Sequence, residues 1–254
     1  MNPLAALRGE ISGNTPRIAL VDTLRGGALL LMVFYHFGFD LNYLGWIHFD
    51  INYDLRWLTA RALILGSFLC IVGVSLALAE AQHKTPQQKL LRTAKIALAA
   101  GLVTAGSWLF IPDQTIYFGT LHAIALMSLV IQLRPLPAGV AVLIGLVAIG
   151  LGSSFSHPVF DFPGLAWLGF MTYKPLTADY VPMLPWFGVC LLGYATAKVF
   201  LQPLLGGKLV KHRAWPEGLL WLGRHSLAIY LLHQPVLLAM LVPITGLLKS
   251  APPN

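Results

Sequence analysis

A histidine and an aspartate lie four positions apart in MVFYHFGFDL, residues 32–41, inside a stretch that is otherwise apolar. On a helix, positions i and i+4 share a face, so Asp40 is expected to hold one imidazole nitrogen of His36 and leave the other free to accept a proton. That arrangement is typical of a general base. The alternative is an ion pair at a helix end, with both side chains reaching toward water.

Asp22 and Arg25 extend this pair into a polar stripe along the same apolar stretch. At about 100° per residue, the four ionisable side chains fall within an arc of about 60° on one helix face. Arg25 and His36 are three turns apart, about 16 Å along the axis, so they are expected near opposite ends of a membrane span. Because an ionisable group at membrane depth costs on the order of 3 kcal/mol, the stripe should face a bundle interior or a hydrated cavity.

His122 and Arg61 lie in two other apolar stretches, and both are predicted at the depth of His36. In FGTLHAIAL the chain enters the membrane from the outer face, which puts His122 about 9 Å deep. Ionisable side chains from three helices in one layer indicate a catalytic site, in which Arg61 or His122 would stabilise an oxyanion. For His122 alone, a hydrogen-bonded histidine of the core is an equally good interpretation.

The last apolar stretch carries His233, followed by Pro235, in a sequence that begins at Arg224. His233 is expected near the middle of the bilayer, and Pro235 removes a backbone donor and could kink the helix there to open a cavity. Arg224, at the cytoplasmic start, could join Arg25 in binding an anionic cofactor, with His233 further along its path. The alternative for Arg224 is a positively charged anchor on the cytoplasmic side.

The composition is that of a membrane protein. The chain has 254 residues, 57% of them hydrophobic and only 11% charged, with a mean hydropathy of +0.72, which is too apolar for a soluble domain of this size. The formal charge of +7 says less than where the charges lie, and no nucleic acid partner is expected. Cys70 and Cys190 lie in apolar stretches and form no CxxC pair, so neither a disulfide framework nor a thiolate metal site is indicated.

The apolar stretches predict an all-α bundle of about seven transmembrane helices with a cytoplasmic amino terminus. Lysine and arginine cluster on one side of these stretches and aspartate on the other, as the positive-inside rule requires. The aromatic-rich outer segments 40–56 and 154–182 fit a membrane interface better than a carbohydrate-facing surface. The predicted spans are 18–39, 57–79, 93–111, 116–133, 137–153, 183–201 and 221–247.

Five motifs carry a resemblance to a known family: LVDTLRGGALLLMVFYHFGFDL, GSFLCIVGVSLALA, FGTLHAIAL, PMLPWFGVCLLGYA and WLGRHSLAIYLLHQPVL. In that order they resemble the bacterial membrane proteins grouped with the catalytic domain of heparan-alpha-glucosaminide N-acetyltransferase, over nearly the whole chain. Asp-x-x-Arg-Gly with a histidine eleven residues after the arginine also resembles the wider membrane acyltransferases that modify cell-surface glycans. The resemblance implies a cytoplasmic segment at 1–17, a transmembrane acyltransferase domain at 18–248 and a short tail at 249–254.

By this resemblance the protein moves an acyl group, expected to be acetyl, from cytoplasmic acyl-CoA to an amine or hydroxyl of a glycan, an aminosugar or another small acceptor outside. The lipid bilayer of a bacterial inner membrane is its expected surroundings, no metal is implied, and the oligomeric state stays open, a homodimer included. The family arginine corresponds to Arg25 and the glycan acyltransferase histidine to His36. The lysosomal enzyme instead has asparagine there and a histidine in the first outer loop, where His48 lies. We favour His36, which has both a carboxylate at helical spacing and a second histidine at its depth.

Two other function classes use the same residues. A proton-coupled transporter of small molecules would use the intramembrane His, Asp and Arg residues as a proton relay, although no inverted repeat is evident. A zinc site formed by His36, Asp40 and His122 is disfavoured, because no further strong ligand is apparent in the sequence. Direct transfer and a ping-pong route through an acylated histidine are both open.

Overall fold

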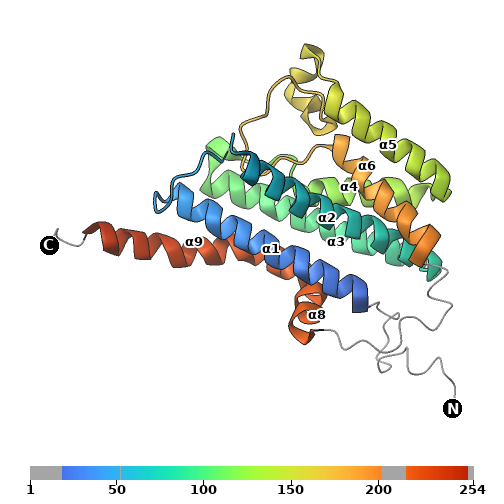
Figure 1. Cartoon of the computed structure of the whole chain (residues 1–254), viewed down its shortest axis with the longest axis horizontal. Coiled ribbons are helices and arrows are strands. Elements are labelled where there is room, and N and C mark those ends of the chain that lie inside the picture. The colour runs from blue at the N-terminus through green and yellow to red at the C-terminus, as the bar shows by residue number, and fades with distance from the viewer. Residues whose placement is uncertain (1–18, 52, 202–215, 251–254) are drawn as a thin grey trace. The chain divides into compact units, whose positions relative to one another are not determined.

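The computed structural model describes residues 19–51, 53–201 and 216–250, with side chains up to residue 246. The predicted segment 1–17, the cations at 208–213 and residues 251–254 of the predicted tail lie outside this description. The described part of the chain is all-helical and has no β-strand (Figure 1). Its α-helices are α1 (Ala19–Tyr43), α2 (Leu55–Ala81), α3 (Pro86–Phe110), α4 (Thr120–Leu133), α5 (Ala138–Ser154), α6 (Met183–Thr196), α8 (Glu217–Arg224) and α9 (Ser226–Ser250).

Five of these helices are long and apolar enough to cross a bilayer: α1, α2, α3, α6 with the π-helical turn that continues it, and α9. Two shorter apolar helices, α4 with 14 residues and α5 with 17, coincide with the fourth and fifth predicted spans. The predicted class, a polytopic membrane helix bundle, is therefore confirmed. Leucines and aromatic residues of α3, and leucines and valines of α5, are exposed, as expected of surfaces that lipid covers.

Within the last predicted span, 221–247, the structure has a break in the helix at a position that the sequence did not predict. The helix ends at Arg224, His225 takes a non-helical conformation, and α9 starts at Ser226. Pro235 lies inside the continuous helix α9, so the break does not fall there. Proline is tolerated within transmembrane helices because neighbouring groups can compensate for the missing donor. The helix reaches Ser250, so the first two residues of the predicted tail are helical.

Polar side chains fix where helices of the bundle begin. Thr85 and Gln88 form a capping box at the start of α3, each side chain accepting a hydrogen bond from the other residue's backbone at 3.2 Å. At the start of α4, Asp179 accepts a 2.7 Å hydrogen bond from the Thr120 backbone N–H. Such caps satisfy donors that the helix leaves open and contribute about 1 kcal/mol each.

The described chain forms two compact units, with the boundary inside α2. One unit comprises α1, residues 55–68 of α2, α8 and α9. Here α1 and α8 pack backbone to backbone, because a Cβ at Gly26 would collide with the Leu219 carbonyl and a Cβ at Gly223 with the Asp22 carbonyl. The indole ring of Trp57 packs directly on Gly38 and holds the start of α2 against α1. We call this the α1/α9 unit.

The other unit comprises residues 69–81 of α2 together with α3, α4, α5 and α6. Glycine allows α2 and α6 to touch, since a Cβ at Gly73 would collide with the Cys190 carbonyl. Its core includes the fully buried Leu69, Leu191 and Tyr194. We call this the α3–α6 unit, and Figure 1 shows α5 and α6 packed along each other within it.

The segment between α5 and α6, predicted on the outer side, is held by side-chain hydrogen bonds and has an aromatic surface. Asp161 accepts hydrogen bonds from the backbone and the hydroxyl of Thr172 at 2.8 and 2.7 Å. The Tyr180 hydroxyl donates to the Ala166 carbonyl at 2.7 Å, and burial raises the pKa of Tyr180 to about 12, so this donor stays protonated. Phe162 nevertheless remains 67% exposed.

Candidate active site

His36 of α1 and His233 of α9 meet within the α1/α9 unit. Their ring centroids are 4.8 Å apart, and the rings are edge to face at 73°. The sequence predicts His233 as a cofactor-binding residue together with Arg25 and Arg224, whereas the structure places its ring directly beside the predicted base. The two rings therefore form one site, to which α1 and α9 each contribute an imidazole.

The hydrogen bonds of the two rings define their tautomers. His36 Nδ1 is 2.9 Å from the Met32 carbonyl oxygen, and His233 Nδ1 is 2.7 Å from the Tyr230 carbonyl oxygen. A carbonyl only accepts, so each Nδ1 carries the hydrogen and each neutral ring presents Nε2 as a proton acceptor. The spacing had predicted that Asp40 orients His36, but the group that does so is the carbonyl of Met32.

Asp40 pairs with a residue that the sequence analysis did not single out. Its side chain is buried, and Oδ1 accepts a 2.7 Å hydrogen bond from Gln234 Nε2 of α9. Because a carboxylate has no hydrogen to give, this contact fixes the amide with its NH2 toward Asp40 and Oε1 on the other side. Gln234 directly follows His233 in the sequence, and a polar amide within an apolar span is the signal that could have identified it.

His36, Asp40, His233 and Gln234 form a polar layer between α1 and α9. Three atoms of this layer are buried and have no hydrogen-bond partner: Asp40 Oδ2, Gln234 Oε1 and His233 Nε2. Buried polar atoms are normally paired, so this concentration of unpaired atoms distinguishes the layer from an ordinary core. All three are acceptors, as is His36 Nε2. A molecule that complements the layer must donate hydrogens to it.

Arg61 and Tyr35 lie beside the histidine pair. Tyr35 packs edge to face against Trp57, with ring centroids 5.0 Å apart, and against His36 at 5.8 Å. The exposed guanidinium of Arg61, on α2, interacts electrostatically with the Tyr35 hydroxyl. The α1/α9 unit thus places Arg61 near the layer while leaving its charge accessible.

The predicted cofactor-binding cations flank the crossing of α1 and α8. Arg25 Nη1 forms a 2.8 Å ion pair with Asp22 Oδ1, one turn earlier on α1. Arg224 is exposed at the end of α8, directly after the Gly223 that touches α1. Arg25 and Arg224 are therefore at the same crossing, and Arg25 lies about 16 Å along α1 from His36.

His122 has a structural role in the α3–α6 unit. The Gly119 backbone N–H donates to Nδ1 at 3.3 Å, so Nε2 carries the hydrogen and donates to Thr104 Oγ1 at 3.1 Å. Thr104 in turn donates to the Ile116 carbonyl at 2.6 Å. Both ring nitrogens thus hold the start of α4, which matches the core-histidine interpretation. The approach of His122 to His36, which is in the other unit, stays a prediction.

His48 is exposed in the loop after α1. Within the described residues it has no hydrogen bond, and its neighbour Phe49 is held by Asn42 at 2.6 Å instead. His36, by contrast, is oriented by a hydrogen bond and has a second histidine beside it. The local geometry therefore favours His36 as the reactive histidine.

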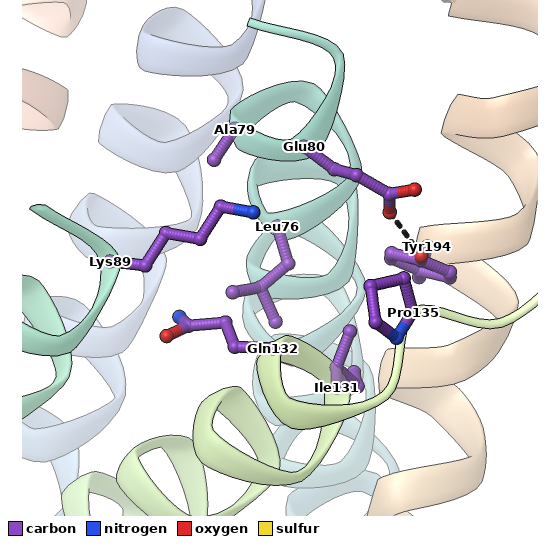
Figure 2. Close-up of a pocket in the computed structure, with 8 residues that line it drawn as sticks. All are labelled: Leu76, Ala79, Glu80, Lys89, Ile131, Gln132, Pro135 and Tyr194. Atoms are coloured by element: carbon purple, nitrogen blue, oxygen red, sulfur yellow. Dashed lines mark hydrogen bonds between the residues drawn. The ribbon is translucent and has the colours of Figure 1, made fainter. Parts of the chain in front are cut away.

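A cavity in the α3–α6 unit lies beside a partly buried charged cluster (Figure 2). Its volume is about 10 Å³, room for about one water molecule. The Tyr194 hydroxyl donates to Glu80, and Lys198 Nζ donates to Glu80 at 2.9 Å and to the Leu136 carbonyl at 3.0 Å. This cluster ties α2 to α6 and to the turn before α5, and its cavity is far too small for an acyl group. The lining residues are Leu76, Ala79, Glu80, Lys89, Ile131, Gln132, Pro135 and Tyr194.

The apolar helices and the buried layer of histidine, carboxylate and amide define a class: polytopic membrane proteins with groups suited to acid–base chemistry. The chain belongs to the family described as heparan-alpha-glucosaminide N-acetyltransferase, catalytic, whose model matches residues 17–235. The match runs from before α1 into α9 and includes His36, Asp40, His233 and Gln234. It confirms the resemblance of the five motifs and indicates a transmembrane acetyltransferase. Neither a curated protein nor a solved structure matches the chain.

The described part of the chain contains no group of three or more His, Cys, Asp or Glu side chains arranged to hold a metal ion.

Proposed function

We propose that the protein is a transmembrane N-acetyltransferase, which moves acetyl from acetyl-CoA to the primary amine of an aminosugar-like acceptor. Family membership supports acetyl transfer. The observation that supports an amine is the set of unpaired acceptors, Asp40 Oδ2, Gln234 Oε1 and His233 Nε2. An ammonium group donates up to three hydrogen bonds, whereas a hydroxyl donates one. The buried carboxylate of Asp40 also suits a cation.

In the proposed reaction His36 is the general base. Its Nε2 first takes one proton from the acceptor ammonium and releases it to solvent, which leaves a neutral amine. The amine nitrogen then attacks the thioester carbonyl carbon as the carbon–sulfur bond breaks. His36 Nε2 takes a second proton from this nitrogen and passes it to the leaving sulfur, so that coenzyme A leaves as the thiol. His233 lies beside this base, and Asp40 holds the acceptor nitrogen in place. Such a base typically contributes 10² to 10⁴ in rate.

Arg61 is the stronger candidate for stabilising the oxyanion. Its guanidinium is accessible and lies in the same unit as His36, whereas the N–H of His122 already donates to Thr104. A preorganised donor of this kind typically contributes 10² to 10³ in rate. A ping-pong variant, in which His36 Nε2 first carries the acetyl group, uses the same residues in a different order.

Acetyl-CoA is proposed to bind with its phosphates at the crossing of α1 and α8. Arg25 and Arg224 supply positive charge there, and guanidinium groups bind phosphate through paired hydrogen bonds. The thin thioester arm would then run along α1 toward His36. The cations predicted on the cytoplasmic side support an orientation with the donor inside and the acceptor outside. The proposed location is a bacterial inner membrane.

Thiol release by purified protein in lipid vesicles tests this function. With acetyl-CoA, we expect more than one equivalent of free coenzyme A per protein to appear only when glucosamine is added, together with N-acetylated product. His48→Ala, which alters an exposed loop histidine, serves as the matched control for His36→Ala and should keep the activity. Proton-coupled movement of a solute without any acceptor-dependent thiol release would instead identify a transporter.

A further inference from the structure

Gln234 connects two of the unpaired acceptors in the layer. Its Nε2 donates to Asp40 Oδ1 at 2.7 Å, and this contact turns Oε1 away from Asp40. Oε1 is itself buried without a partner, as is Asp40 Oδ2. One amide therefore holds the carboxylate in place and also presents an acceptor of its own.

A primary amine and a hydroxyl differ in what they can give to these atoms. An ammonium can donate one hydrogen to Asp40 Oδ2 and one to Gln234 Oε1, and give the third to the base at His36. A hydroxyl has a single hydrogen, which the base must remove, so both oxygens would remain buried and unpaired. Sites built to bind a donor reject analogues that lack it, because their own polar groups are left without partners.

We propose that Gln234 is a specificity-determining residue that selects a primary amine over a hydroxyl as the acetyl acceptor. The inference rests on the proposed acetyl transfer. Gln234 acts in two ways: Oε1 contacts the acceptor nitrogen directly, and Nε2 keeps Asp40 Oδ2 directed at the same nitrogen. Gln234→Met keeps the length of the side chain while removing both functions.

The test is a competition between glucosamine and glucose in one reaction with acetyl-CoA, with the N- and O-acetylated products measured by mass spectrometry. We expect wild type to form the N-acetyl product predominantly, and Gln234→Met to lower the ratio of N- to O-acetylation about 10- to 150-fold. Because both products form in the same tube, a smaller amount of folded protein scales both and leaves the ratio unchanged. Gln87→Met, which alters an exposed glutamine of α3, should keep the wild-type ratio.

Gln234→Asn provides a second variant if Gln234→Met does not fold. Its amide is one methylene shorter and cannot reach both positions, so the ratio should fall here as well. An unchanged ratio in a variant that folds in the same amount as wild type would overturn the role of Gln234. If wild type acetylates neither sugar while releasing no thiol, the proposed acetyl transfer itself fails, which is a separate outcome.

Discussion

Asp40→Asn changes one atom of the layer from acceptor to donor. The two side chains have nearly the same shape, and Gln234 Nε2 requires an oxygen opposite it. The Asn carbonyl must therefore take the place of Oδ1, which puts the Asn NH2 where the unpaired Oδ2 was. The substitution removes a buried charge and directs two hydrogens at the place proposed for the acceptor nitrogen.

The expected effect separates activity from stability. A hydrogen bond to a charged group is worth about 1.5 to 3 kcal/mol, and each 1.36 kcal/mol is tenfold in rate. We therefore expect kcat/KM for glucosamine to fall about 10- to 150-fold. Asp40 is 1% exposed with one oxygen unpaired, so removing its charge relieves a desolvation penalty, and Tm should stay the same or rise.

The assay measures kcat/KM for acetyl transfer and Tm on the same vesicle preparation. Asp113→Asn, an exposed carboxylate before α4, is the matched control and should change neither quantity. Wild-type kcat/KM in Asp40→Asn would refute the binding role of the carboxylate. If Tm and kcat/KM both fell, Asp40 would be a structural residue.

Two more substitutions test the α3–α6 unit. Lys198→Met removes the donor that joins Glu80 to the Leu136 carbonyl, and we expect it to lower the free energy of unfolding by about 1 to 3 kcal/mol in chemical denaturation. Lys95→Met, on the exposed face of α3, is the control. Equal stability of the two variants would contradict the role of the cluster. His122→Leu removes the hydrogen bond to Thr104, so it should destabilise the protein by about 1 kcal/mol while changing kcat less than threefold. If kcat instead fell more than 100-fold while stability stayed unchanged, His122 would again be the candidate oxyanion donor.

The membrane helices were predictable because their length and apolarity are properties of the local sequence. The polar stripe of α1 was likewise predictable from its 3.6-residue period, which places Asp22, Arg25, His36 and Asp40 on one face. Periodicity does not say how one helix is rotated against another. The contact between Asp40 and Gln234, 194 positions apart, depends on that rotation and could not be predicted.

The hydrogen bonds of the histidines show the same limit. The i,i+4 spacing of His36 and Asp40 allowed a side-chain pair, but the carbonyl of Met32, four residues before His36, competes for the same ring nitrogen and forms the bond. For His122 a sequence signal existed, since it stands three residues after Gly119, where a polar side chain can reach back to the start of the helix. The break at His225 has no proline or glycine at the position itself to mark it.

The most direct measurement of the central claim is single-turnover thiol release from acetyl-CoA with glucosamine, comparing His36→Ala with His48→Ala in lipid vesicles. With His36 as the base, His36→Ala should slow the reaction 10²- to 10⁴-fold, while His48→Ala reacts at the wild-type rate. Wild-type release by His36→Ala, or loss of release in His48→Ala alone, would contradict the account.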